Sequence, residues 1–238
     1  MFFVFFYKLK SLVKLAFFFV WPGKSIDACL TYNFTDERLK FTHLLECVNY
    51  LRVAEIPNVY FEFGCHSGRT FSAVLNAARF FSMANFRAIA FDSFMGLPDT
   101  SPLEDGVFRG GEFSTSRSRF KSIVKFRTGS NLADKQIVEG FYEESLTAAL
   151  QAELPKVGMV HIDVDLYSST ISVLEFVKPL LVEGSVILFD DWYCFSPGSN
   201  RGERKAFLEF CANNPDFKFE EWKAYSTFGK SFFVVQTA

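Results

Sequence analysis

From residue 35 onward, short apolar runs alternate with stretches whose apolar residues recur at helical spacing. The first helix is predicted to begin near Thr35 and to end before Pro57. Its apolar face is predicted to comprise Leu39, Leu44, Leu45, Val48 and Leu51. Strands at 59–64 and 86–94 follow, separated by a tight loop and a helix. Together they form a βαβ unit.

The rest of the chain continues this alternation. A helix is predicted at 115–127, because Phe120, Ile123, Val124 and Arg127 have helical spacing and Gly129 can close it. A β-strand through "IVKFR" is the alternative. Further strands are predicted at 135–140, 157–165 and 184–192, with helices at 143–151, 168–181 and 202–213. The chain ends in an antiparallel pair, 217–225 and 230–237. This order predicts an α/β fold with a doubly wound, mostly parallel, Rossmann-like sheet of about seven strands and a C-terminal antiparallel hairpin.

Acidic residues gather where the predicted strands end: Glu62, Asp92, Asp163, Asp165, Asp190 and Asp191. In a doubly wound sheet, ligands bind at the carboxyl ends of the strands. A single Asp at such a point commonly caps a helix or a turn. Four carboxylates on two neighbouring strands, however, would repel one another unless a cation or a shifted protonation compensated. Oxygen ligands without a Cys pair or His cluster favour a hard ion such as Mg²⁺. His161 is predicted to be a core histidine bonded to backbone.

The loop "EFGCHSG" at 62–68 follows the first strand. Its two glycines allow the backbone to approach a ligand closely, and the next helix offers free N–H groups. The spacing differs from the Gly-x-Gly-x-x-Gly dinucleotide motif, and there is no P-loop. Asp92 ends the next strand, where it could accept hydrogen bonds from ribose hydroxyls. A nucleoside without a polyphosphate, such as S-adenosylmethionine, fits this combination.

Composition narrows the ligand class and the compartment. The 238 residues, 49% hydrophobic and 22% charged, suit one large domain. A net charge of -2 gives no reason to expect nucleic-acid binding. The five cysteines form no Cys-x-x-Cys pair, which argues against both a zinc site and a disulfide framework and favours a reducing cytoplasm.

Residues 1–34 are predicted to form an aromatic-rich helical extension of a domain spanning 35–238. Lys8, Lys10 and Lys14 interrupt its apolar runs, so neither run is long enough to span a bilayer. The segment also lacks the features of a signal peptide. With its lysines on one half of a helix, residues 1–21 could lie at a membrane surface, and membrane association therefore stays open. The alternative is a helix docked on the domain or on a partner subunit.

Several sequence pieces occur in an order that resembles the macrocin O-methyltransferase-like (TylF-type) family. The resemblance covers about residues 35 to 235 and rests on the combination of "FEFGCHSGRTF", "AFDSFMGLPD", "GGEFSTS", "VEGFYEESL", "HIDVDLYSST", "ILFDDW" and "GERKAFLEF". This family comprises class I, metal-assisted, S-adenosylmethionine-dependent methyltransferases of sugar hydroxyls. The resemblance therefore implies an O-methyltransferase that acts on a sugar or a glycosylated small molecule. We also expect a homo-oligomer.

The resemblance implies a role for each matching residue. Asp165 would be the general base, and Mg²⁺ would be held by Asp163, Asp190 and Asp191. The implied S-adenosylmethionine contacts are Glu62, Gly64, Ser67, Gly68, Asp92 and Ser93. The chain departs from the family pattern in its Phe-rich N-terminus and at Cys65-His66, where the family more often has a small or aliphatic residue followed by Tyr or Phe.

Residues 95–134 are predicted to form a lid that selects the substrate. The basic side chains between Arg109 and Arg127 could bind an anionic sugar, although a solvated helix face is the simpler reading. Trp192, Tyr193, Arg201 and Arg204 could contact a sugar ring, and Tyr167 could equally be core packing. Two other functions stay open. One is a non-catalytic binding module of the same fold, and the other is a metal-dependent hydroxylase, against which the lack of a His-rich triad argues.

Overall fold

The computed structural model describes residues 24–98, 109–196 and 201–237, with side chains from residue 34 onward. The stretch 1–21, predicted to contact a membrane or a partner, lies outside these residues. The chain divides into two units, Met1–Leu39 and Lys40–Ala238, and helix α2 (Lys24–Val53) contributes to both. All the strands of the described residues, and all the site residues, belong to the second unit. The predicted division after residue 34 and the predicted lid at 95–134 remain predictions.

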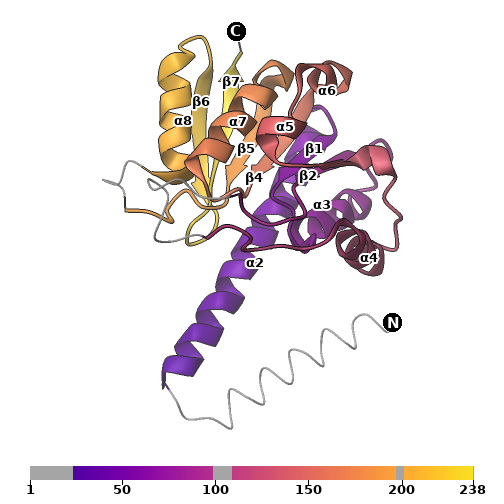
Figure 1. Cartoon of the computed structure of the whole chain (residues 1–238), viewed down its shortest axis with the longest axis vertical. Helices are drawn as coiled ribbons and strands as arrows, with labels where there is room; N and C mark the ends of the chain where they lie inside the picture. Colours follow the sequence, from indigo (N-terminus) through magenta and orange to yellow (C-terminus); the bar gives the residue numbers. More distant parts are fainter. Residues whose placement is uncertain (1–23, 99–108, 197–200, 238) are drawn as a thin grey trace. The chain divides into compact units, whose positions relative to one another are not determined.

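In the described part of the chain, seven strands form one sheet in the order β3-β2-β1-β4-β5-β7-β6 (Figure 1). Their bounds are β1 Val59–Phe63, β2 Arg87–Asp92, β3 Ile137–Glu139, β4 Val157–Ile162, β5 Leu181–Phe189, β6 Lys218–Ala224 and β7 Lys230–Gln236. Strands β1 to β5 are parallel, and β7 and β6 add an antiparallel hairpin beside β5. The predicted fold class is confirmed. Because chain order reverses between β1 and β4, the ligand site of such a sheet is expected at their carboxyl ends.

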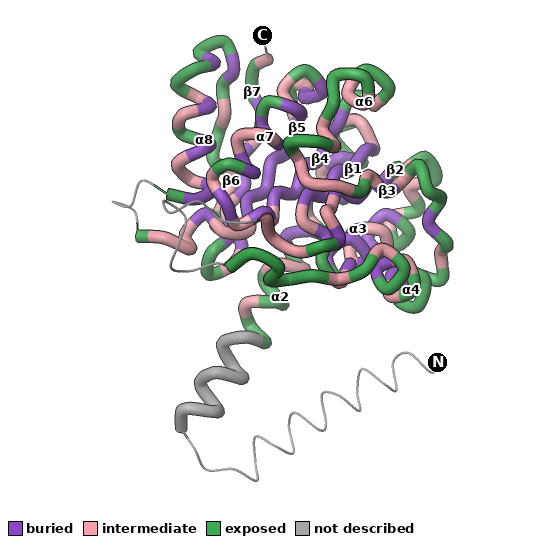
Figure 2. The backbone as a smooth tube through the Cα atoms, in the orientation of Figure 1, coloured by how far each residue is buried: buried purple, intermediate pink, exposed green. Residues whose placement is uncertain are grey.

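Helices cover both faces of the sheet. One face packs against α2, α3 (Arg69–Phe80) and α4 (Arg117–Thr128). The other packs against α5 (Tyr142–Ser145), α6 (Ala148–Glu153), α7 (Tyr167–Val177) and α8 (Gly202–Asn213). Two 3₁₀ turns, Asp134–Gln136 and Lys178–Leu180, complete the elements. Figure 2 shows buried residues concentrated along the central strands and exposed residues on the outer sides of the helices.

The predicted helix at 115–127 is α4, and the alternative strand is wrong. Ser116 Oγ accepts a hydrogen bond from the Arg119 amide at the start of the helix. Gly129 ends it in the left-handed conformation, with φ 73°. The single helix predicted at 143–151 is instead two short helices. Thr147 interrupts them, because its side chain caps the second helix through the Leu150 amide.

The buried face of α2 differs from the predicted one. Leu39 and Leu45 are 51% and 38% exposed, so neither belongs to the core. The inward-facing residues that recur at helical spacing are His43, Leu44, Cys47, Val48 and Leu51. Lys40 lies three and four residues before His43 and Leu44, and therefore points from the same side of the helix.

None of the helices in the described segments is long and apolar enough to cross a membrane.

Candidate active site

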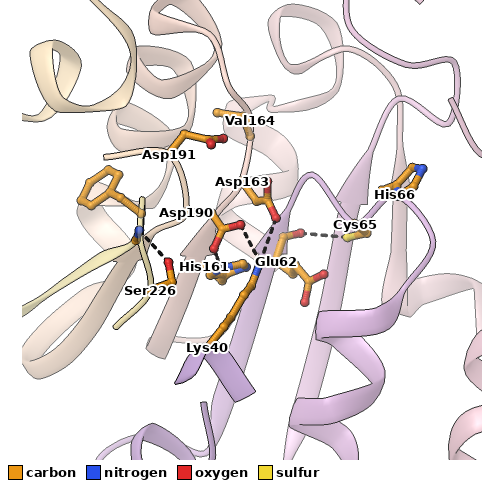
Figure 3. Close-up of polar contacts among 12 residues, drawn as sticks. Lys40, Glu62, Cys65, His66, His161, Asp163, Val164, Asp190, Asp191 and Ser226 are labelled. Atoms are coloured by element: carbon orange, nitrogen blue, oxygen red, sulfur yellow. Dashed lines mark hydrogen bonds and ion pairs between the residues drawn. The ribbon is translucent and has the colours of Figure 1, made fainter. Parts of the chain in front are cut away.

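The pleat of β4 and β5 directs one pair of acids toward α2. In β4, Met159 packs in the α2-side core whereas Val160 and Ile162 pack in the other, so the alternation places His161 and Asp163 on the α2 side. His161 pairs with Leu188 and Ile162 with Phe189, which makes Asp163 and Asp190 the next pair along. Figure 3 shows these two carboxylates side by side at the strand ends. We call Asp163 and Asp190 the inner acids.

Lys40 reaches the inner acids from α2 (Figure 3). Its Nζ donates to Asp190 Oδ2 at 2.5 Å and lies 3.5 Å from Asp163 Oδ2. Burial acts to lower the pKa of Lys40, but the charges of Asp190 and Asp163 outweigh it and raise that pKa above its usual value. Burial likewise acts to raise the pKa of Asp190, and Lys40 outweighs it and lowers that pKa. The Lys40–Asp190 pair is therefore ionised.

Asp190 has further partners on its other oxygen. Tyr225 Oη lies 3.1 Å from Asp190 Oδ1 and 2.9 Å from the Phe189 carbonyl, so its single proton is shared between the two acceptors. His161 Nε2 lies 3.6 Å from the same Oδ1. His161 is fully buried, as predicted, but it is not bonded to backbone. Neither ring nitrogen has a hydrogen-bond partner among the described residues, because the ring faces a carboxylate at slightly more than bonding distance.

Two further acids, Asp165 and Asp191, lie just beyond the ends of β4 and β5. The predicted strand at 157–165 stops at Ile162, and Asp165 takes the left-handed conformation with φ 61°. Asp165 and Asp191 are close enough that each changes the pKa of the other. Burial, followed by the charge of Asp163, raises the pKa of Asp165 to about 7. Burial, followed by the charge of Asp165, raises the pKa of Asp191 well above its usual value. We call Asp165 and Asp191 the outer acids.

Glu203 holds the two acid-bearing loops together. It is fully buried at the start of α8. Its Oε1 accepts from the Val164 amide at 3.3 Å, and its Oε2 accepts from the Asp191 amide at 2.9 Å. One carboxylate thereby fixes the distance between the segments that follow β4 and β5, and with it the spacing of the outer acids.

A cavity of about 300 Å³ opens at the carboxyl ends of β1, β2 and β4. This volume is at the lower end of the range for small-molecule sites. The predicted site residues that line it are Gly64, Asp92, Ser93, Asp163, Asp165 and Asp191. Four other predicted residues are outside its lining, namely Glu62, Ser67, Gly68 and Asp190. Their predicted contacts with cofactor or metal remain predictions.

The loop after β1 is held in place by Asp92. Asp92 Oδ2 accepts from the amides of Cys65 and His66 at 2.7 and 2.9 Å, and its Oδ1 accepts from the Phe94 amide at 2.7 Å. A carboxylate has about four acceptor positions, so Asp92 can still accept from a ligand hydroxyl. Ser93 Oγ donates to the Gly96 carbonyl at 2.8 Å and so tightens the following turn.

Glu62 and Gly68 serve packing on the α3 side. Tyr60 Oη donates to Glu62 Oε2 at 2.5 Å. Burial is the main cause that raises the pKa of Glu62 to about 8. At Gly68, with φ 68°, an added Cβ would lie 2.9 Å from the ring of Phe120, so this glycine permits close packing of α3 on α4.

The residues predicted to contact a sugar ring have mixed positions. Trp192 is 4% exposed and packs against Phe189, Phe207 and Phe232, so it belongs to the core. Arg204 lies over the Trp192 ring at 5.9 Å. Tyr167 is half-buried and donates to Glu209.

The basic residues of α4 are partly neutralised. Arg117 pairs with Asp134 and Glu139 at 3.0 and 3.1 Å, and Lys121 pairs with Asp134 at 3.0 Å. These exposed pairs agree with the simpler reading of a solvated helix face.

Sequence reasoning did not select Lys40, Glu203 or Tyr225. Lys40 had a usable signal, since it precedes Leu44 and Cys47 by four and seven residues and so lies on the apolar face of its helix. Glu203 and Tyr225 are far from the acids in sequence, and only the sheet order brings them together.

Comparisons with known proteins agree with this fold. Residues 28–210 match the family model for Macrocin-O-methyltransferase (TylF). No curated protein sequence matches the chain. Among solved structures, the O-methyltransferase NovP superposes with a TM-score of 0.68 at 20% identity, covering 83% of this chain and 80% of NovP. The apo structure of CalS11, the TDP-rhamnose 3'-O-methyltransferase of calicheamicin biosynthesis, gives 0.59 at 22% identity, covering 94% and 92%. An O-methyltransferase from Bacillus cereus in complex with SAH gives 0.52 at 13%, covering 94% and 97%. At these identities the structural likeness establishes the fold.

Proposed function

The chain belongs to the macrocin O-methyltransferase (TylF) family of S-adenosylmethionine-dependent O-methyltransferases, and from that premise we propose that it methylates a hydroxyl of a sugar or glycosylated small molecule with the help of Mg²⁺. The observation that carries this proposal is the composition of the cavity. Its lining combines Gly64, Asp92 and Ser93, which follow β1 and β2, with Asp163 and the outer acids, which follow β4 and β5. A nucleoside cofactor and an ionisable hydroxyl can therefore meet in one space.

The cofactor side consists of the loop after β1 and the end of β2. Asp92 holds the loop open through the Cys65 and His66 amides and lines the cavity, where it can accept from ribose hydroxyls. Gly64 lets the loop turn beside β4 with φ 81°. The fold of the SAH complex from Bacillus cereus, which this chain shares, supports a site for the same cofactor here.

The acceptor side is the acid-lined wall. We assign Asp165 as the general base, because it lines the cavity and its left-handed turn takes it out of the strand. The acceptor oxygen would attack the methyl carbon of the sulfonium as the carbon–sulfur bond breaks, and its proton would pass to Asp165. The methyl ether of the acceptor, S-adenosylhomocysteine and the protonated carboxyl of Asp165 are the immediate products at the site.

The cavity acids suit a divalent ion. Asp163, Asp190 and Asp191 supply oxygen ligands of the kind that Mg²⁺ prefers, and we assign them as its protein ligands. Asp163 and Asp191 line the cavity, and possible ligand atoms of Asp163 and Asp190 lie within 4.8 Å of each other. Burial, followed by the charge of Asp190 at Asp163 and of Asp165 at Asp191, raises the pKa of both carboxyls, and Lys40 offsets this only in part. Bound there, Mg²⁺ would stabilise the negative charge that develops on the acceptor oxygen.

The sugar class follows from relatives. CalS11 is described as a TDP-rhamnose 3'-O-methyltransferase, and the family is named for a macrocin O-methyltransferase. A metal-dependent hydroxylase is disfavoured, because among the described residues the candidate metal-ligand group contains a single histidine, the fully buried His161.

The test is transfer of a labelled methyl group from S-adenosylmethionine to a panel of nucleotide sugars and glycosides, with added Mg²⁺ or with a chelator. We expect Asp165→Asn to lose about a hundredfold or more in turnover, while its affinity for S-adenosylhomocysteine changes by less than about threefold. Asp216→Asn, which alters an exposed acid elsewhere, is the matched control. Full turnover in Asp165→Asn would refute the base assignment. Methylation of non-sugar hydroxyls alone would refute the substrate class.

A further inference from the structure

Two segments of the chain run side by side at the edge of the cavity. Residues 95–98 lie after β2, and residues 109–113 lie before α4. The Leu97 amide donates to the Glu112 carbonyl at 3.0 Å, and the Leu97 carbonyl accepts from the Gly111 amide at 2.9 Å. These two backbone hydrogen bonds hold the segments together, so their side chains form one border of the cavity.

The side chains of this border that adjoin the cavity are apolar. Met95 is 68% exposed and directly precedes a lining residue, Gly96, whereas Phe113 is 54% exposed and is itself part of the lining. Half-buried Leu97 and Pro98 line the cavity as well. A single exposed apolar residue is ordinary, but several beside one cavity indicate a surface for a ligand. We define the apolar rim as Met95, Leu97, Pro98 and Phe113.

Phe113 is held in a conformation that residues with a Cβ rarely adopt. Its φ is 61°, in the left-handed region. Its ring meets that of His66, from the loop after β1, in a T-shaped arrangement with the centroids 6.2 Å apart and the planes at 85°. Because the side chain stays largely exposed, core packing does not account for this backbone conformation. Such conformations gather at ligand sites.

The cavity cannot enclose the whole acceptor. Its volume of about 300 Å³ is at the lower end of the range for a single small ligand, yet it has to take the adenosyl cofactor and the reacting sugar. The group attached to the sugar therefore lies outside the cavity, at its edge. The apolar rim lies at that edge, so its chemistry decides which attached groups bind.

The cavity lining disfavours a diphosphate next to the sugar. It contains the carboxyl groups of Asp92, Glu143, Asp163, Asp165 and Asp191. Among the described residues that line the cavity there is neither Lys nor Arg, the side chains that pair with phosphate groups. Arg109 is the one basic residue of the two rim segments, and it is outside the lining. A diphosphate would therefore meet apolar side chains and carboxyl groups.

We propose that the apolar rim binds the group to which the acceptor sugar is attached, and that this group is an apolar aglycone with Phe113 as its main contact. The proposal rests on the proposed function and narrows its substrate class, whereas CalS11 is described as acting on a nucleotide-linked sugar, TDP-rhamnose. It also places the reaction after glycosyl transfer, because the enzyme that joins the sugar to its aglycone has to supply the acceptor.

Calorimetric titration of the full chain saturated with S-adenosylhomocysteine tests the proposal without any turnover. The ligands are the 4-nitrophenyl glycoside, the methyl glycoside and the nucleoside diphosphate derivative of glucose, galactose and rhamnose, so each set differs only in the group attached to one sugar. We expect at least one 4-nitrophenyl glycoside to bind about tenfold more tightly than the other two forms of its sugar. The proposal is overturned if no 4-nitrophenyl glycoside binds, or if the nucleoside diphosphate form binds most tightly.

Variants of the rim assign the preference to its residues. Phe113→Ala should bring the 4-nitrophenyl and methyl glycosides within about threefold of each other and leave the affinity for S-adenosylhomocysteine unchanged within the same factor. Phe113→Leu keeps an apolar side chain and should retain at least about a threefold preference. Phe80→Ala removes a Phe that is 75% exposed at the end of α3, and as the matched control it should bind like the wild type. A preference that survives Phe113→Ala would overturn the proposal.

Arg109→Gln tests the competing anionic contact. We expect it to change no ligand affinity by more than about threefold, since the Arg109 side chain is outside the lining. A loss confined to the nucleoside diphosphate sugars would show that the rim accepts a diphosphate, and would overturn the proposal.

Methyl-transfer assays on the same ligands separate this proposal from the proposed function. If the 4-nitrophenyl and methyl glycosides were methylated with equal kcat/KM, the proposed function would stand and the role of the rim would fall. If the 4-nitrophenyl glycosides bound through Phe113 and only non-sugar hydroxyls were methylated, the rim would stand and the sugar assignment would fall.

Discussion

At Gly64 the loop after β1 packs closely against the end of β4, and replacement of this glycine by Ala should disrupt both segments. Its φ is 81°, and a Cβ built on it would lie 1.7 Å from the Asp163 carbonyl oxygen. Real Cβ atoms essentially never lie closer than 3.0 Å to such an atom, so the two segments would have to separate by more than about 1 Å. Both are fixed, because the Gly64 amide donates to Phe91 at 3.0 Å and the Asp163 amide donates to Phe63 at 2.9 Å.

The expected cost has two parts. A left-handed conformation costs a residue with a Cβ about 1–2 kcal/mol. Separating β1 from β4 also breaks strand hydrogen bonds and opens packing between buried strands, which brings the expected total to at least about 4 kcal/mol. Gly129→Ala is the matched control, since its φ is 73° and a Cβ there would meet no atom within 4 Å. The control should lose only the conformational part.

Urea unfolding of the two variants, followed by fluorescence and circular dichroism, gives the comparison. We expect Gly64→Ala to be less stable than Gly129→Ala by about 3 kcal/mol or more, or to fail to fold while the control folds. A difference below about 1 kcal/mol would mean that the β1 loop and β4 can move apart cheaply, and the close approach at Gly64 would then not organise the site.

Three further changes test the supports of the site. Glu203→Ala leaves the amides of Val164 and Asp191 without an acceptor, so the free energy of unfolding should fall by about 2–4 kcal/mol in urea titrations. Turnover should fall more than cofactor affinity, and a loss of stability alone would contradict the positioning of Asp191. Asp92→Asn should weaken S-adenosylhomocysteine about tenfold in calorimetric titration, because an amide cannot accept at both ends, and unchanged affinity would exclude that role. Burial raises the pKa of Glu62 from 4.5 in the unfolded chain to about 8 in the folded protein, so folding favours the protonated carboxyl. The stability that this protonation contributes is complete below pH 4.5 and is lost as the pH rises to 8. Between about pH 6.5 and 8 the wild type should lose about 2 kcal/mol of stability that Glu62→Gln retains, and parallel pH curves would rule this out.

The order of elements was predictable because each one carries a local signal. The strands read as short apolar runs, since parallel strands are buried on both faces. The helix α4 was ambiguous by periodicity alone, and the Ser116 cap and Gly129 decide between helix and strand. The split of the predicted helix at 143–151 was not foreseen, although Thr147 is a residue that favours the start of a helix.

The sequence predicted that acids gather at the site, but it did not predict which partner each acid contacts. That Asp163 and Asp190 would lie close together followed from two parallel strands ending at one edge. That Asp190 and Asp191 would have different partners follows from the pleat, which turns adjacent residues to opposite faces. The sequence contains this information, but it is usable only once the strand register is known. Lys40 was missed because a charge on an apolar helix face reads as an interruption of that face.

The acids at the ends of β4 and β5 therefore lie in two different electrostatic environments. Asp190 is compensated within the chain by Lys40, with Tyr225 beside it, and the ion pair links α2 to the sheet. The outer acids form no ion pair with a basic side chain among the described residues. Burial, followed by the charge of Asp163 at Asp165 and of Asp165 at Asp191, raises the pKa of both. Such repulsion costs stability and contributes nothing to packing. A fold that needed these residues only for structure would gain by replacing them, so their presence beside a cavity is best explained by what binds there.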